Sequence, residues 1–221
     1  MLYIVRHGQT HKNKQKVLQG RSDLPLNDEG RAQALEVGDK LNELGIKPEI
    51  LYSSPLIRAV ETAELIGKAA SDGAKSVENA GAAERTEDAV KSEIRIDERL
   101  IEMDYGPYEG MDLTKPAPEV MAFFMDFAGT PAPDGMEQLS SVVARSGEFL
   151  EEIREEAMEN DVVISTHAIA MKGLLEYLTP ESKGGYWSKY IGNCDVYAAE
   201  VNEEGYGIPY PLITGDVKPG V

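Results

Sequence analysis

Hydrophobic positions along the chain form short apolar runs and longer stripes at helical spacing. Short runs rich in β-branched and aromatic residues predict strands at 2–5, 50–53, 162–165 and 196–201, and an alternating run predicts one at 94–97. Apolar stripes predict helices at 28–44, 55–70, 137–159 and 168–180. Strands that alternate with helices predict an α/β fold, a three-layer α/β/α sandwich with a mostly parallel sheet.

Capping residues and a proline predict where two of these helices begin. Asn27 is an N-cap candidate, followed by two acidic residues that suit the positive end of a helix. Ser54 is predicted to cap the next helix, with Pro55 as its first residue.

The remaining segments fit one domain over residues 1–221. Residues 71–93 have little apolar content and predict a surface insertion, and the tail from residue 203 is expected to be loosely held. Residues 111–135 contain aromatic residues among several prolines. They predict either a lid over a pocket or a small helical satellite that only packs.

The amino-acid composition limits the classes of molecule that the protein is expected to bind. A formal net charge of -17 disfavours nucleic acid and anionic lipid, so a phosphate pocket would need a local cluster of Arg and His. Cys194 is the single cysteine, which excludes an intramolecular disulfide. Since no stretch is typical of a signal peptide or a membrane span, we expect a cytoplasmic protein without membrane contact.

Candidate chemistry lies at the predicted strand ends. Arg6 and His7 directly follow the first apolar run, where an α/β sheet binds ligands. A guanidinium suits phosphate oxygens, and a neutral imidazole nitrogen can attack phosphorus or accept a proton. Arg58 follows the second strand near a helix start, and His167 ends the fourth strand. Together they would surround one transferring phosphoryl group.

Several motifs occur in a fixed order along most of the chain. They are Arg6-His7-Gly8-Gln9-Thr10, Leu18-Gln19-Gly20, Ser53-Ser54-Pro55 with Arg58, Leu100 with Glu102, Glu109-Gly110, Gly135 with Glu137, and Ser165-Thr166-His167. This set resembles the histidine phosphatase superfamily, which includes the cofactor-dependent phosphoglycerate mutases. The resemblance implies a phosphoglycerate mutase-like fold.

The resemblance also implies roles. His7 would be the nucleophile that becomes phosphorylated, and Glu102 would be the general acid. Glu98, Asp104 and Glu109 satisfy the spacing as well. The residues expected to bind the phosphoryl group or the substrate are Arg6, Asn13, Gln19, Gly20, Arg58, His167 and Ala168.

His11 lies four residues after His7, a spacing that binds metal on a helix, but the loop-like composition argues against a helix there. We therefore expect neither a metal nor a cofactor. Ala168 stands where the family frequently has glycine, and its methyl group would limit backbone approach to the phosphate.

The sequence favours a metal-independent phosphomonoesterase that hydrolyses a small phosphorylated metabolite through a phosphohistidine. Mutases of the family carry clustered arginines after the acid, whereas Lys115 is the only basic residue between Gly110 and Arg145. A phosphoglycerate-type mutase and a catalytically silent module that binds a phosphate ligand or a protein remain alternatives. A homodimer is the default expectation for oligomeric state.

Overall fold

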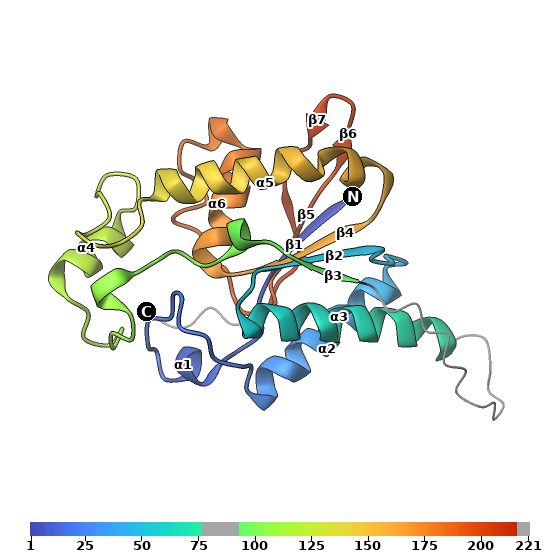
Figure 1. The fold of residues 1–221 in the computed structure, drawn as a ribbon, viewed down its shortest axis with the longest axis horizontal. Helices are drawn as coiled ribbons and strands as arrows, with labels where there is room; N and C mark the ends of the chain where they lie inside the picture. Colours follow the sequence, from blue (N-terminus) through green and yellow to red (C-terminus); the bar gives the residue numbers. More distant parts are fainter. Residues whose placement is uncertain (77–92, 216–221) are drawn as a thin grey trace.

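The computed structural model describes residues 1–76 and 93–215. Its centre is a six-stranded sheet in the order β3-β2-β4-β1-β5-β8 (Figure 1). The strands are β1 (Leu2–Arg6), β2 (Ile50–Ser53), β3 (Ile94–Ile96), β4 (Val162–Thr166), β5 (Val196–Ala199) and β8 (Tyr210–Ile213). Strands β1 to β4 run parallel, and β5 is antiparallel to both of its neighbours.

Helices cover both faces of the sheet (Figure 1). Helices α2 (Asp28–Glu43) and α3 (Ile57–Ser76) lie on one face, and α5 (Leu139–Glu159) and α6 (Ala168–Leu178) lie on the other. This arrangement confirms the predicted α/β/α sandwich. The apolar run of β1 has no polar position because both faces of the strand are buried. Leu2 and Ile4 join the core on the α5–α6 side, and Tyr3 and Val5 join the core on the α2–α3 side.

The parallel register brings the strand ends together. Arg6 pairs with Thr166, and Ser53 pairs with Ser165. The residues that follow β1, β2 and β4 therefore meet at one edge of the sheet, as the sequence predicts.

Several element boundaries differ from the predictions. A four-residue helix, α1 (His11–Lys14), lies in the segment expected to be a loop, because the Thr10 and Asn13 side chains form a reciprocal capping box. Helix α5 begins at Leu139 rather than at residue 137, and β5 ends at Ala199. The loop after β3 contains two short 3-10 helices, η1 (Glu98–Leu100) and η2 (Gly106–Tyr108).

Helix α3 corrects two expectations. It begins at Ile57, so Pro55 lies in the preceding turn rather than in the first helical position. It also continues to Ser76, so residues 71–76 extend this helix instead of opening an insertion. Residues 77–92 of the predicted insertion lie outside the described residues.

The predicted lid segment contains α4 (Pro118–Met125). Val120 and Phe123 are fully buried in a third apolar cluster with Tyr105, Ile169 and Trp187. This segment therefore packs against the α6 end of the domain. Whether it also closes over the site stays a prediction.

The tail is more regular than expected. After the 3-10 helix η3 (Pro180–Ser182) and β5, a small antiparallel pair forms from β6 (Val201–Asn202) and β7 (Gly205–Tyr206). Strand β8 then joins the main sheet beside β5. Residues 205–206 and 210–213 of the predicted loose tail are thus held by strand pairing, and residues 216–221 of that tail lie outside the described residues.

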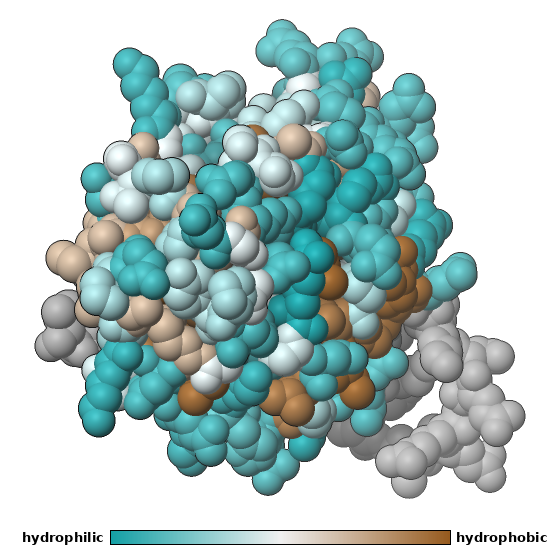
Figure 2. Space-filling model, turned by 60° about the vertical axis from the view of Figure 1, so that its left-hand side comes forward, coloured by the Kyte–Doolittle hydropathy of each residue, from teal (hydrophilic) through white to brown (hydrophobic). Residues whose placement is uncertain are grey.

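The surface is mostly hydrophilic on the face drawn in Figure 2. Figure 2 brings the α4 end of the molecule forward, and hydrophilic residues dominate this face, with hydrophobic residues gathered in its lower half. No helix among the described residues combines the length and apolarity needed to cross a membrane.

Candidate active site

His7 lies at the C-terminal end of β1 with its ring in one tautomer. Its backbone N–H donates to the Thr166 carbonyl at 2.9 Å, and its side chain is 4% exposed. The ring atom Nδ1 lies 2.7 Å from the Gly8 carbonyl oxygen. Because a carbonyl oxygen only accepts hydrogen bonds, Nδ1 carries the proton, and the lone pair of the neutral ring is on Nε2.

Arg58 faces that lone pair. The Nε–H of this fully buried side chain donates to His7 Nε2 at 3.3 Å. Its terminal nitrogens donate to the carbonyl oxygens of Ser22 at 2.8 Å and Gly20 at 2.6 Å. All three acceptors are neutral, so the buried guanidinium keeps a charge that an anion can neutralise.

His167 completes the pair of imidazoles. Its ring centroid is 5.1 Å from that of His7. Its Nε2 lies 2.7 Å from Ser54 Oγ, whereas its buried Nδ1 has no hydrogen-bond partner among the described residues. A buried nitrogen without a partner costs free energy unless a ligand contacts it.

Arg6 contributes the second guanidinium. One terminal nitrogen donates to the Ile191 carbonyl at 2.6 Å. Its buried Nε has no partner within the described part of the chain. The two arginines and the two histidines therefore lie around the ends of β1, β2 and β4, and the two guanidiniums create local positive charge in an acidic protein.

Burial sets the charge state of the site. Burial, followed by the nearby Arg58 charge, lowers the pKa of both His7 and His167 well below its usual value. Both rings are thus neutral at pH 7. Burial also lowers the pKa of Arg58 to about 10, partly opposed by the Glu102 charge, so Arg58 stays protonated.

Glu102 is the carboxylate that reaches the site. It is 4% exposed, and its oxygens accept backbone N–H bonds from Met103 at 2.8 Å, Ile169 at 3.3 Å and Ala170 at 3.0 Å. The last two donors belong to the first turn of α6, directly after His167. Glu102 therefore lies at the N-terminus of α6, which begins directly after His167, and negative charge is stabilised there.

The other spacing candidates have different surroundings. Glu98 is exposed. Asp104 pairs with Arg21 at 3.3 Å. Glu109 accepts the Gly20 N–H at 2.9 Å and pairs with Lys12 at 3.8 Å. Glu109 thus holds the loop that accepts from Arg58, and Glu102 is the best placed to exchange a proton with a ligand.

The expected binding residues lie around this centre in different ways. The Gly20 carbonyl orients Arg58. Gln19 accepts the Thr10 hydroxyl at 2.7 Å, and its buried Nε2 has no partner in the described segments. The Asn13 Oδ1 atom already accepts the Thr10 N–H at 3.0 Å. Ala168 is the first residue of α6.

The sequence analysis gave three supporting residues no role at the site. Ser54 contacts His167. Its position directly after β2 is a signal for a site residue, but the sequence analysis assigned it only as a helix cap. Asn193 donates to the His7 carbonyl at 2.9 Å, and Thr62 accepts the Gly8 N–H at 3.1 Å. A turn residue and a mid-helix threonine carry no local sequence signal for this role.

Comparison with known proteins gives the family. The sequence model described as "Histidine phosphatase superfamily (branch 1)" matches residues 2–209. The chain belongs to this superfamily. This result confirms the predicted family and the predicted enzyme class, a phosphatase.

Individual relatives of this histidine phosphatase agree. It is 31% identical over 186 residues to phosphoglycerate mutase-like protein 4 of Arabidopsis thaliana, covering 82% of this chain and 72% of that protein. It is 26% identical over 207 residues to putative phosphoserine phosphatase 2 of Hydrogenobacter thermophilus, covering 92% and 90%. Among solved structures, Bacillus stearothermophilus YhfR superposes with a TM-score of 0.71 at 26% identity, covering 98% and 97%.

The fold extends to a more distant neighbour. The phosphoserine phosphatase of Entamoeba histolytica, at 21% identity, superposes with a TM-score of 0.72 over 97% of this chain and 96% of that chain. This likeness supports the phosphoglycerate mutase-like fold.

His11 differs from His7 in its surroundings. It begins α1 and is exposed, whereas His7 is buried. Across residues 1–76 and 93–215, no group of three or more His, Cys, Asp or Glu side chains is arranged to hold a metal ion.

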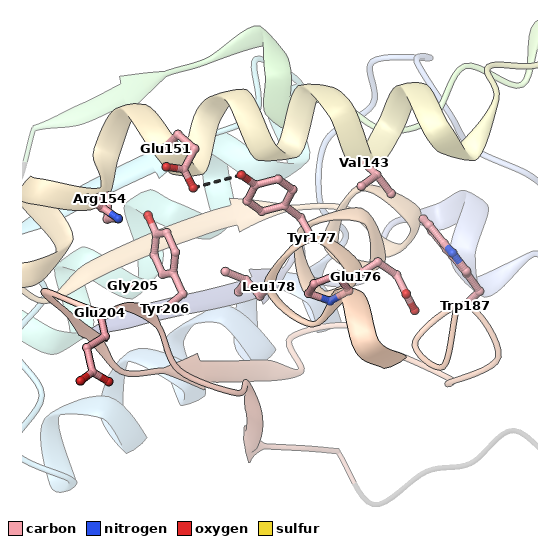
Figure 3. A pocket seen from close by; sticks show the side chains of 11 residues that line it. Val143, Glu151, Arg154, Glu176, Tyr177, Leu178, Trp187, Glu204, Gly205 and Tyr206 are labelled. Atoms are coloured by element: carbon pink, nitrogen blue, oxygen red, sulfur yellow. Dashed lines mark hydrogen bonds between the residues drawn. The ribbon is translucent and has the colours of Figure 1, made fainter. Parts of the chain in front are cut away.

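A separate cavity of about 600 Å³ lies between α5, the end of α6 and the β6–β7 pair (Figure 3). Its lining includes the carboxylates of Glu151, Glu176 and Glu204 but only one guanidinium, Arg154. The Tyr177 hydroxyl donates to Glu151 at 3.0 Å. Excess negative charge makes this cavity a poor site for a phosphoester.

Proposed function

We propose that this histidine phosphatase hydrolyses a small phosphomonoester through a phosphohistidine at His7, without a metal ion. The observation that carries the proposal is the His7 Nδ1 contact with the Gly8 carbonyl at 2.7 Å. It leaves the Nε2 lone pair directed at Arg58, and Arg6 at the end of β1 supplies a second guanidinium. A nucleophile and charge-neutralising groups around one point are what phosphoryl transfer requires.

In the first step, His7 Nε2 attacks phosphorus and the bond to the ester oxygen breaks. The leaving oxygen takes a proton from the Glu102 carboxylic acid, which acts as the general acid. Arg6, Arg58 and His167 stabilise the phosphoryl oxygens. Arg58 exchanges its contact with Nε2 for a phosphoryl oxygen.

In the second step, water attacks the phosphohistidine and gives a proton to the Glu102 carboxylate. The bond between Nε2 and phosphorus breaks, and inorganic phosphate leaves. Neutral His7 and the protonated Glu102 are restored together. The same carboxyl group thus acts first as acid and then as base.

The test is hydrolysis of a phosphomonoester panel by wild type, His7→Ala and Glu102→Gln in the presence of a chelator. We expect chelator-resistant hydrolysis by wild type and no hydrolysis by His7→Ala. Glu102→Gln should lose about 10²- to 10⁴-fold in turnover, the usual contribution of a general acid. Full activity of His7→Ala would contradict the proposal.

The same assay separates the alternatives. Isomerisation of 3-phosphoglycerate that exceeds hydrolysis would identify a mutase. Binding without turnover across the panel would identify a silent module. The sparse basic residues between Gly110 and Arg145 support the phosphatase.

A further inference from the structure

Lys172 is a buried cation that the proposed reaction does not use. Its side chain, in the middle of α6, is 7% exposed. Its Nζ atom donates to the Trp187 carbonyl oxygen at 2.8 Å and lies 5.0 Å from the centroid of the Phe127 ring. The Phe127 ring adds a cation–π contact.

Lys172 forms no ion pair with any of the described residues. None of the ion pairs there includes Lys172. An ammonium has three N–H donors, and a single acceptor, the Trp187 carbonyl, is present. Burying a charge without a full set of partners is costly, so the arrangement suits an anion that arrives as a ligand.

Lys172 lies on the helix that begins directly after His167, close to the candidate active site. Helix α6 begins at Ala168, directly after His167, and Lys172 lies on the same face one turn later. Helical side chains lean toward the N-terminus, which here is the catalytic end. Burial is the main cause that lowers the pKa of Lys172; the Arg6 charge lowers it further, and the Glu102 charge raises it.

We propose that Lys172 binds a carboxylate on the leaving-group part of the phosphoester, so that this enzyme prefers carboxylate-bearing substrates. The inference rests on the proposed function for the reacting phosphoryl group. A carboxylate fits better than a second phosphate, because one ammonium balances a monoanion, whereas phosphate recognition favours the arginine fork.

The test compares two ligands that differ in one group. 3-Phosphoglycerate carries a carboxylate where glycerol 3-phosphate carries a hydroxymethyl group. Calorimetric dissociation constants are measured in a His7→Ala background, in which no phosphohistidine forms. With Lys172 intact, we expect 3-phosphoglycerate to bind about tenfold to a hundredfold more tightly, as for a hydrogen bond to a charged group. Adding Lys172→Met should bring the ratio of the two constants close to one.

Lys189→Met is the matched control. Lys189 also lies over an aromatic ring, 4.1 Å from the Tyr186 centroid, but it is exposed. Its substitution should leave the ratio unchanged. Equal affinities with Lys172 intact, or an unchanged ratio in Lys172→Met, would overturn the proposal.

A pH series tests the proposal even if Lys172→Met does not fold. Burial lowers the pKa of Lys172 to about 8, so its charge is present below that pH and is lost above it. The charged groups that act on it are Arg6 from β1 and Glu102 from the loop after η1. On its own helix, Glu176 already accepts from Ser182 and Gly184.

Between pH 7 and pH 9.5 both ligands keep their phosphate and carboxylate charges. The affinity ratio should therefore fall in the Lys172 protein and stay constant in Lys172→Arg. A ratio independent of pH in both would count against Lys172. Because binding is measured without turnover, failure of the hydrolysis assay and failure of this proposal are separate results.

Discussion

At the scale of single residues, the buried neutral histidines make the folded protein less stable at acidic pH. The pKa of His7 is well below 6.5, first through burial and then through Arg58. The ring in the unfolded chain takes up a proton near pH 6.5, but the folded ring does not. The unfolded state therefore binds more protons, and the free energy of unfolding falls as the pH drops below about 6.5.

His7→Gln removes this contribution. Urea unfolding between pH 7 and 5.5 should show a shallower loss of stability in the variant, by up to about 1.4 kcal/mol per pH unit. Carboxylates titrate alike in both proteins and cancel in the comparison. Identical slopes would mean that the folded ring is not held neutral.

Ser54 is expected to position His167. Ser54→Ala removes the hydroxyl that lies 2.7 Å from His167 Nε2, and the loss of one hydrogen bond should lower kcat about tenfold. Ser53→Ala is the control, since this equally buried neighbour donates to the Ser54 carbonyl at 2.9 Å instead. If the ratio of the two kcat values is one, Ser54 has no specific role.

The sequence pattern predicted the two histidines at the centre of the site better than the residues that hold them in position. His7 and His167 follow apolar runs, so their meeting at one sheet edge was readable from local sequence. Asn193 reaches the His7 carbonyl from a distant turn. That contact depends on long-range folding, which no local pattern encodes.

At the scale of elements, helix α2 is pressed against the main chain beside the nucleophile. A Cβ on Gly30 would lie 2.1 Å from the Gln9 carbonyl oxygen, and one on Gly8 would lie 2.3 Å from the Gly30 oxygen. The close packing of these two glycines fixes the chain directly after His7.

Gly30→Ala should therefore destabilise the protein, although alanine favours a helix by about 1 kcal/mol. Backbone atoms cannot yield as a side chain can, so we expect a loss of about 1–3 kcal/mol in unfolding free energy and a lower kcat. Glu29→Ala, exposed on the same turn, is the control for urea unfolding and activity. A stabilised Gly30→Ala would contradict the close contact.

The core strands and long helices were predictable because their apolar periods are strong. Strand β8 was not, because Pro211 and the preceding Gly207 and Pro209 are typical of a loop. An edge strand tolerates proline, and β8 exists through its pairing with β5. Helix α1 was missed because its cap is Thr10 with Asn13, a variant of the usual Ser/Thr and Glu/Gln pair.

At the scale of the whole molecule, excess negative charge opposes compactness. A formal net charge of -17 produces self-repulsion that salt screens. We expect the melting temperature to rise between 10 and 150 mM sodium chloride. Sucrose at equal osmolality serves as the uncharged control, and a melting temperature that falls with salt would show that attractive ion pairs dominate.

The central claim is a covalent phosphoryl group on His7. It is tested by intact mass after brief mixing with a phosphomonoester at low temperature, followed by acid or alkali treatment and peptide mapping. The account predicts an acid-labile, alkali-stable phosphoryl adduct that maps to His7 and is absent in His7→Ala. Hydrolysis without any such adduct, or an adduct on another residue, would contradict it.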